Sequence, residues 1–197
     1  MRVKSNWFRS GRDKTPQELA GAAAFIAWRI AQNALNNMRR AGFDIAVGPQ
    51  YFQFLSEFLI FLVQLADRIA YRHLDPEERA AFTTELANRA AANLAENWGN
   101  LLGGEFAEHK AAFIARLNLR AEDYANFEYE KGAANFSFMR QLGLFMQEVV
   151  DERDRTWVTD QIVASEAPEA VETLERAIAG LLELEPKRRA ARGSSGD

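Results

Sequence analysis

Residues 49–73 read PQYFQFLSEFLIFLVQLADRIAYRH, and this stretch decides the fold. Pro49 suits the first turn of a helix, where a backbone N–H is not needed. On a wheel of about 3.6 residues per turn, the polar side chains gather into one stripe over about a third of the circumference. Because the other two thirds are apolar and rich in phenylalanine, we expect other helices or a second copy of the molecule to enclose this helix.

The polar stripe of this helix allows three interpretations. It is the one solvated strip of the helix, or it joins a buried network of ion pairs with arginines of another helix, or it borders a ligand pocket lined by Tyr51, Phe54 and Phe58. Periodicity alone does not distinguish water from a cavity. The stripe consists of Gln53, Ser56, Glu57, Gln64, Asp67 and Arg68.

The helices on either side begin at clear start signals. Residues 15–18, Thr-Pro-Gln-Glu, have the spacing of a capping box and predict a helix that runs to Arg40 and stops at Gly42. Residues 75–78, Asp-Pro-Glu-Glu, repeat the signal and predict a third helix. This helix should end at 98–100, before a turn at Gly103 and Gly104.

Both of these flanking helices are rich in alanine, whose small side chain lets helix axes approach closely. We therefore expect them to flank the bulky helix over 49–73. On the first helix, the apolar face continues into Asn33 and Asn37. These amides either bond to another helix or mark the point where the helix leaves the core, because an unsatisfied buried amide is costly.

The second half of the chain also has helical periodicity. We predict a helix over 106–119, a helical segment over 122–151 with a break near 130–135, a brief helix over 157–164 with a cap at Ser165, and a final helix over 168–184. No stretch has the strict alternation of a strand. The predicted fold class is all-α, a single-domain bundle of about six helices.

Charge divides the chain into one domain and two short termini. Residues 1–14 form a basic arm and residues 187–197 a disordered basic tail, whereas the bundle domain between them, 15–186, is acidic. An acidic body does not suit specific nucleic-acid binding, which needs positive charge on a structured face. We expect the basic termini to make at most weak contact with an anionic surface.

Composition excludes several chemistries. The chain of 197 residues has no cysteine, which rules out disulfides, thiolate nucleophiles and iron–sulfur clusters. It has neither a phosphate-binding glycine motif nor a nucleophile-elbow motif, and we expect no cofactor. The longest uncharged apolar run, 58–66, is far shorter than the roughly 20 residues that span a bilayer. We therefore expect a cytoplasmic protein without a transmembrane helix.

The two histidines are the remaining candidates for acid–base or metal chemistry. Glu105 and His109 are four residues apart, which places two metal ligands on one helix face, but an acidic residue at a helix start also has a plain electrostatic explanation. His73 is either a proton-transfer group or a residue that bonds the last carbonyls of its helix. The ligand-binding residues that we predict are Tyr51, Phe54, Glu57, Phe58, Asp67 and His73.

Two functions fit these observations. The first is a non-enzymatic role in protein association, as a homodimer or an adaptor, in which contact buries the excess apolar surface of the helical segments over 49–73 and 122–151. The alternative is a bundle, catalytic or not, that binds a small molecule or metal in an apolar aromatic pocket. The lack of a dedicated catalytic constellation favours the first function, and the amount of aromatic surface favours the second.

Overall fold

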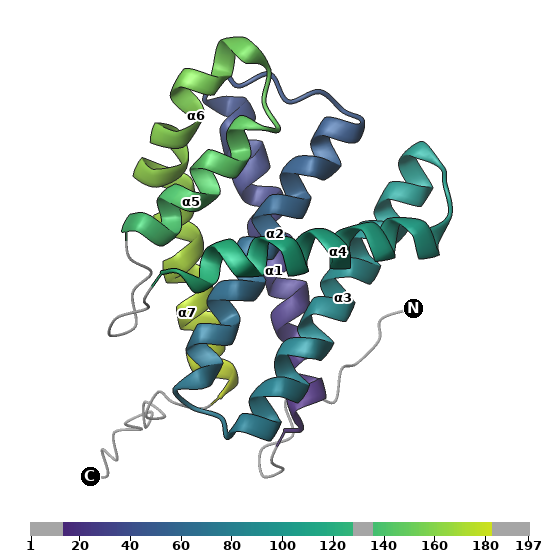
Figure 1. Cartoon of the computed structure of the whole chain (residues 1–197), viewed down its shortest axis with the longest axis vertical. Coiled ribbons are helices and arrows are strands. Elements are labelled where there is room, and N and C mark those ends of the chain that lie inside the picture. Colours follow the sequence, from purple (N-terminus) through teal and green to yellow (C-terminus); the bar gives the residue numbers. More distant parts are fainter. Residues whose placement is uncertain (1–13, 128–135, 183–197) are drawn as a thin grey trace, which may run out of the picture.

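The computed structural model describes residues 14–127 and 136–182, and all secondary structure in these ranges is helical (Figure 1). Because η2, α6, η3 and α7 follow one another without a break, these ranges contain six separate helical rods, which confirms the predicted all-α bundle. The elements are α1 (Pro16–Arg40), α2 (Pro49–Tyr71), α3 (Pro76–Leu102), α4 (Phe106–Ala125), α5 (Phe136–Gln147), the 3₁₀ turn η2 (Glu152–Asp154), α6 (Arg155–Gln161), the π-helical turn η3 (Ile162–Glu166) and α7 (Ala167–Leu181).

The predicted termini fall almost entirely outside this description. Of the basic arm over 1–14 only Lys14 is described, and the basic tail over 187–197 is not. Lys14 donates to the carbonyl oxygen of Leu181 at 3.3 Å, so the first and last described helices meet at one end of the bundle. Among the helices of residues 14–127 and 136–182, none combines the length and hydrophobicity that a bilayer crossing requires.

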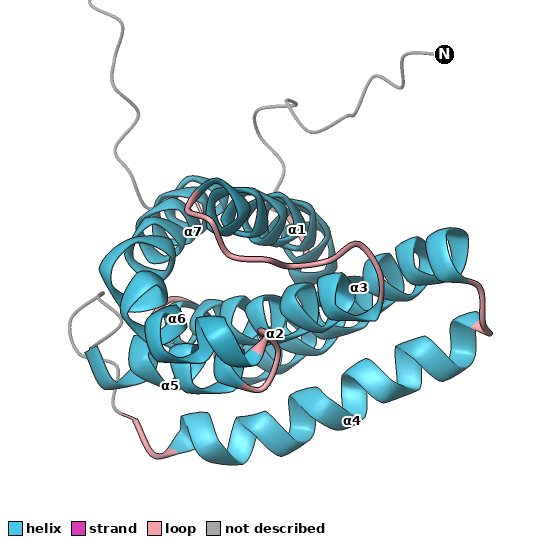
Figure 2. Cartoon of the chain, turned by 90° about the horizontal axis from the view of Figure 1, so that it is seen from above, coloured by secondary structure: helices cyan, strands magenta, loops and turns pink. Residues whose placement is uncertain are grey.

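Helix α2 lies at the centre of the bundle and packs against α1, α3, α4, α5 and α7 (Figure 2). The rings of Phe54, Phe58 and Phe61 are fully buried. The ring centroid of Phe61 lies 5.2 Å from that of Phe138 on α5 and 6.3 Å from that of Tyr124 on α4. The prediction that other helices enclose this segment is confirmed. Since one chain covers this surface by itself, α2 no longer supplies an argument for a homodimer.

Helices α1 and α3 begin where the capping signals predict. Thr15 Oγ1 accepts from the Glu18 N–H at 3.2 Å, and the Glu18 carboxylate accepts from the Thr15 N–H at 3.0 Å. Asp75 accepts from the N–H groups of Glu77 and Glu78, both at 2.9 Å. As expected, both helices pack against α2, and they also pack against each other. Their small side chains are buried at these contacts: Ala20, Ala23, Ala24, Ala27, Ala31, Ala90, Ala91 and Ala95.

The prediction that the third helix ends at 98–100 is wrong, because α3 continues to Leu102. Packing outweighs the weak helix propensity of Gly99 here: the ring of Trp98 stacks on that of Phe52 at 4.9 Å and on that of His109 at 4.9 Å. The chain turns at Gly103 and Gly104, which both have positive φ. A Cβ on Gly104 would lie 2.4 Å from Nε2 of His109, so glycine is required there on two grounds.

The predicted helix over 106–119 is too short. Helix α4 continues to Ala125, since Arg120 and Tyr124 extend its contact with α2 and α5 beyond Leu119. The helical segment predicted over 122–151 is therefore divided between the end of α4 and α5. The predicted break near 130–135 lies outside the described residues.

The predicted cap at Ser165 is also wrong. Ser165 lies inside the π-helical turn η3, through which α6 passes directly into α7. A π-helical turn accommodates an extra residue within a helix and occurs often at functional sites. This turn ends at Glu166, whose side chain is buried between α7 and α1.

Candidate functional site

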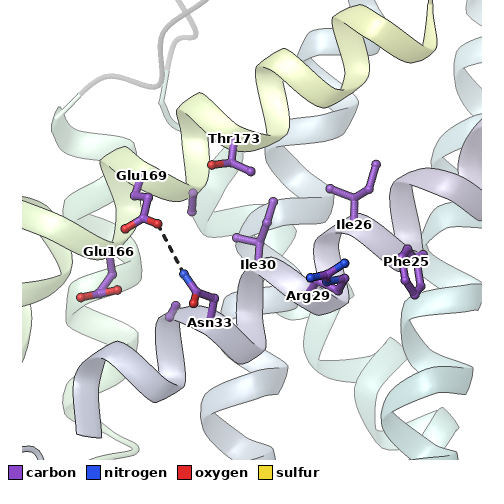
Figure 3. A pocket seen from close by; sticks show the side chains of 10 residues that line it. Phe25, Ile26, Arg29, Ile30, Asn33, Glu166, Glu169 and Thr173 are labelled. Atoms are coloured by element: carbon purple, nitrogen blue, oxygen red, sulfur yellow. Dashed lines mark hydrogen bonds between the residues drawn. The ribbon is translucent and has the colours of Figure 1, made fainter. Parts of the chain in front are cut away.

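A cleft of about 360 Å³ lies between α1 and α7 (Figure 3). It combines an apolar wall with a few charged and amide side chains, as small-molecule sites do. Glu166 and Glu169 lie at one end together with Asn33, and Phe25 and Arg29 lie toward the other. The lining residues are Phe25, Ile26, Arg29, Ile30, Asn33, Ala34, Glu166, Glu169, Ala170 and Thr173.

Glu166 is the most unusual group of this cleft, because its side chain is only 3% exposed. One carboxylate oxygen accepts from Nε2 of Gln161 at 3.1 Å, and the other accepts from Nδ2 of Asn37 at 3.3 Å. Burial raises the pKa of Glu166 above its ordinary value, and these two hydrogen bonds, with a third from the side chain of Ser165, oppose the rise only in part. A buried carboxylate held by neutral amides is thus one end of the cleft.

The remaining polar groups of the cleft reach its rim. Asn33 donates from Nδ2 to the exposed Glu169 at 3.4 Å, a long hydrogen bond that links α1 to α7. The guanidinium carbon of Arg29 lies 6.0 Å from the centroid of the Phe25 ring, which is 60% exposed. The cleft is therefore negative at the end next to η3 and positive near Phe25.

The raised pKa of Glu166 gives the protein a defined pH dependence. Between the ordinary glutamate pKa and the raised one, the folded state holds a proton that the unfolded chain has released, so stability falls as the pH rises through this window. We expect the difference in free energy of unfolding, wild type minus Glu166→Gln, to fall as the pH rises from the ordinary glutamate pKa through the raised pKa of Glu166. Urea denaturation across this range measures the difference, and a flat or rising curve contradicts the assignment.

The six predicted ligand-binding residues do not come together in one site. Phe54 and Phe58 stack in the core with centroids 5.7 Å apart. Tyr51 is half-buried beneath the guanidinium of Arg39. His73 is exposed in the turn between α2 and α3. None of these four lines the α1–α7 cleft.

Glu57, the fifth of these residues, belongs to a buried ion-pair network. Its side chain is fully buried and accepts from Arg116 at 2.9 Å and from Arg120 at 3.0 Å, and Arg120 also pairs with Glu148 at 2.6 Å. The guanidinium of Arg120 lies 3.6 Å above the centroid of the Phe145 ring. Of the three interpretations of the polar stripe, the ion-pair network is therefore the one that the structure supports at Glu57.

Asp67, the sixth, lines a second cleft of about 480 Å³ between α2, α3 and α4. Asp67 accepts from Arg79 and from Oγ1 of Thr83, and Arg68 in the same cleft donates to the carbonyl oxygen of Tyr124. These charged groups are engaged in joining the helices. The α1–α7 cleft, where Glu166 meets only neutral donors, is for this reason the better candidate site.

The proposed metal ligands Glu105 and His109 lie at the α3–α4 turn. Glu105 is exposed, and Nε2 of His109 lies 3.0 Å from the carbonyl oxygen of Gly103, which assigns the proton to that nitrogen. Within residues 14–127 and 136–182, no group of three or more histidine, aspartate or glutamate side chains is placed to hold a metal ion. His109 packs against Trp98 and the glycine turn, which accounts for its position.

Our sequence analysis missed the two acidic residues and Arg29 of the α1–α7 cleft. It did identify Asn33 and Asn37 as polar groups on an apolar face, and both bond to carboxylates of α7 or η3. That unusual pair was the available signal for the site. Comparisons of this chain with family models, with curated proteins and with solved structures find no match.

Proposed function

We propose that this protein binds a small organic molecule in the α1–α7 cleft. The observation that carries the proposal is the buried carboxylate of Glu166 at one end of an amphipathic cleft of about 360 Å³. This volume is at the lower end of the range of about 300–1,000 Å³ typical of ligand sites. A perturbed acidic group beside an apolar wall is a common property of such sites.

A rim substitution tests this function without disturbing the core. Thr173 is exposed at the cleft, so Thr173→Trp should fill the cleft with an indole ring and prevent binding. The control is Glu172→Trp, the neighbouring residue, which does not line the cleft and is exposed. Suitable probes are hexylamine, hexanol and hexanoate, which share one apolar chain and differ in their polar end.

We expect at least one probe to stabilise the wild type and the control but not Thr173→Trp. At about ten times its Kd a ligand stabilises the folded state by about 1.4 kcal/mol, which raises Tm by about 3–6 °C in a chain of this size. Differential scanning calorimetry measures the shift. If no probe raises Tm, or if Thr173→Trp responds as the control does, the cleft is not a binding site.

A second candidate function is self-association, the role that the sequence favoured. The end of the α3–α4 hairpin projects beyond the rest of the bundle in Figure 2. Exposed apolar side chains lie at this end. Leu101 is 53% exposed, Leu102 42% and Phe106 48%. Clustered apolar surface at a projecting end favours contact with a second copy of the chain. The predicted cytoplasmic location remains a prediction.

Sedimentation velocity tests this candidate. If the hairpin end mediates a homodimer, the wild type should sediment as a dimer at tens of micromolar, and Leu101→Ser with Phe106→Ser should sediment as a monomer. Leu119→Ser, equally apolar and 61% exposed but in the middle of α4, is the control and should remain dimeric. A wild type that is monomeric throughout this range removes self-association from consideration.

A further inference from the structure

The two carboxylates of the α1–α7 cleft, buried Glu166 and exposed Glu169, differ from the carboxylates that join other helices of the bundle. Glu57 and Asp67 are each paired with arginine. Within the described residues, Glu166 and Glu169 form no ion pair, and their hydrogen-bond donors are neutral: the amides of Gln161 and Asn37 and the hydroxyl of Ser165 at Glu166, and the amide of Asn33 at Glu169. The described residues therefore supply no partner of opposite sign to the negative end of the cleft.

A primary ammonium group supplies what this end of the cleft lacks. It carries a positive charge and three N–H donors, and the Glu166 carboxylate, with about four acceptor sites, has room for a further hydrogen bond beside those from Gln161, Asn37 and Ser165. Hydrogen bonds between two charged groups are roughly twice as strong as those between neutral ones. Glu169, at the rim, lies on the same helix one turn away and adds a second acceptor.

The rest of the cleft restricts what the other end of the ligand is. Ile26, Ile30 and Phe25 offer an apolar wall on α1, opposite Ala170 of α7. Arg29 stands beside this wall and would repel a second cationic group at that end. The lining thus matches one cationic end and one apolar body.

We propose that the α1–α7 cleft selects small amphiphiles with a single primary ammonium group, which Glu166 and Glu169 bind while the apolar body lies along Phe25, Ile26 and Ile30. This inference rests on the proposed ligand-binding function and specifies its ligand class. It predicts discrimination between probes of equal length by their polar end alone.

A titration followed by ¹H–¹⁵N NMR of the full chain tests the selectivity. Hexylamine should shift the amides of residues 26–34 and 169–173. Hexanol should bind about tenfold or more weakly and hexanoate should not bind, because a hydrogen bond to a charged group contributes at least this factor. 1,6-Diaminohexane should also bind more weakly than hexylamine, because its second ammonium group is repelled by Arg29. The probes are added to about 10 mM, above the roughly 1 mM Kd expected of so small a ligand.

Two variants assign the selectivity to the carboxylates. Because Glu169 is exposed, the Glu169→Gln variant should fold normally. It should bind hexylamine more weakly and hexanol as the wild type does. Glu166→Gln should do the same to a larger degree. The control Glu172→Gln, on the same helix but outside the cleft and paired with Arg176, should bind hexylamine as the wild type does.

The outcomes distinguish failure of the ammonium selectivity from failure of the proposed ligand-binding function. If hexanol or hexanoate shifts the cleft amides as strongly as hexylamine, the cleft binds ligands but does not select ammonium groups, and the inference is overturned alone. If hexylamine binds but Glu169→Gln and Glu166→Gln leave its Kd unchanged, the inference is likewise overturned. If none of the probes shifts these amides, both the inference and the proposed function fall.

Discussion

Arg120→Leu is expected to lower the free energy of unfolding by about 3–5 kcal/mol, the usual effect of removing one partner of a buried ion pair. Glu57 is fully buried, and without Arg120 its carboxylate would keep only Arg116, whose side chain is 41% exposed and reaches the solvent. The substitution also removes the guanidinium that covers the Phe145 ring. Urea denaturation followed by circular dichroism measures the loss.

Two further variants show whether the unpaired charge is the cause. Glu57→Leu combined with Arg120→Leu removes both partners and should recover much of the lost stability, since replacing a buried pair by apolar residues is often neutral. Arg89→Leu breaks the ion pair with Glu85, in which both side chains lie on α3 and are at least partly exposed to solvent, and should change stability by less than about 0.5 kcal/mol. A double variant no more stable than Arg120→Leu would mean that burial of Glu57 does not determine the effect.

Phe61→Ala should have an effect of similar size for a different reason. The ring of Phe61 joins α2 to both α4 and α5, and its removal leaves a cavity where three helices meet. Such truncations cost about 3–5 kcal/mol, which corresponds to a fall in Tm of about 6–20 °C for a chain of this size. Calorimetry measures both quantities.

The matched control for Phe61→Ala is an apolar side chain outside the core. Leu119 on α4 is 61% exposed, and Leu119→Ala should change stability by less than about 0.5 kcal/mol. If Phe61→Ala cost no more than this control, the centre of the bundle would not be tightly packed. The contrast between the two variants thus measures how much of the stability depends on the enclosure of α2.

The sequence predicts most of this architecture because its strongest signals are local. A helix start signal is complete within four residues, and the predicted caps form at Thr15 and Asp75. The apolar surface of residues 49–71 similarly requires enclosure whatever the neighbours are. Helix starts and the central position of α2 follow from such signals alone.

The errors occur where distant residues decide the outcome. Helix α3 continues past Trp98 because the rings of Phe52 and His109 stack on it. Both rings lie outside residues 76–102, so the periodicity of that segment could not predict the extension. The partners of Glu57 are on α4, 59 and 63 residues away along the chain. Periodicity identified Glu57 as exceptional but could not distinguish an arginine partner from solvent.

The candidate cleft was beyond sequence analysis for the same reason. Asn37 and Glu166 are separated by 129 residues, and only the packing of α1 against η3 and α7 brings them within 3.3 Å. Ser165 resembles a helix cap, which suggests two separate helices where the structure has one continuous run. No composition or spacing rule marks a π-helical turn, so the position of Glu166 was not predictable.

The extra residue in η3 determines how α7 is rotated about its own axis, and so which of its side chains face the core. Each residue advances an α-helix by about 100°, so excision of a single residue between Ile162 and Ser165 would leave α7 helical but rotate it about its own axis. Glu169 would then swing away from Asn33, and the apolar stripe of Val171, Leu174 and Ile178 would turn out of the core. The alignment between the acidic end of the cleft and the buried face of the last helix therefore depends on chain length at this one point, and side-chain substitution cannot reproduce it.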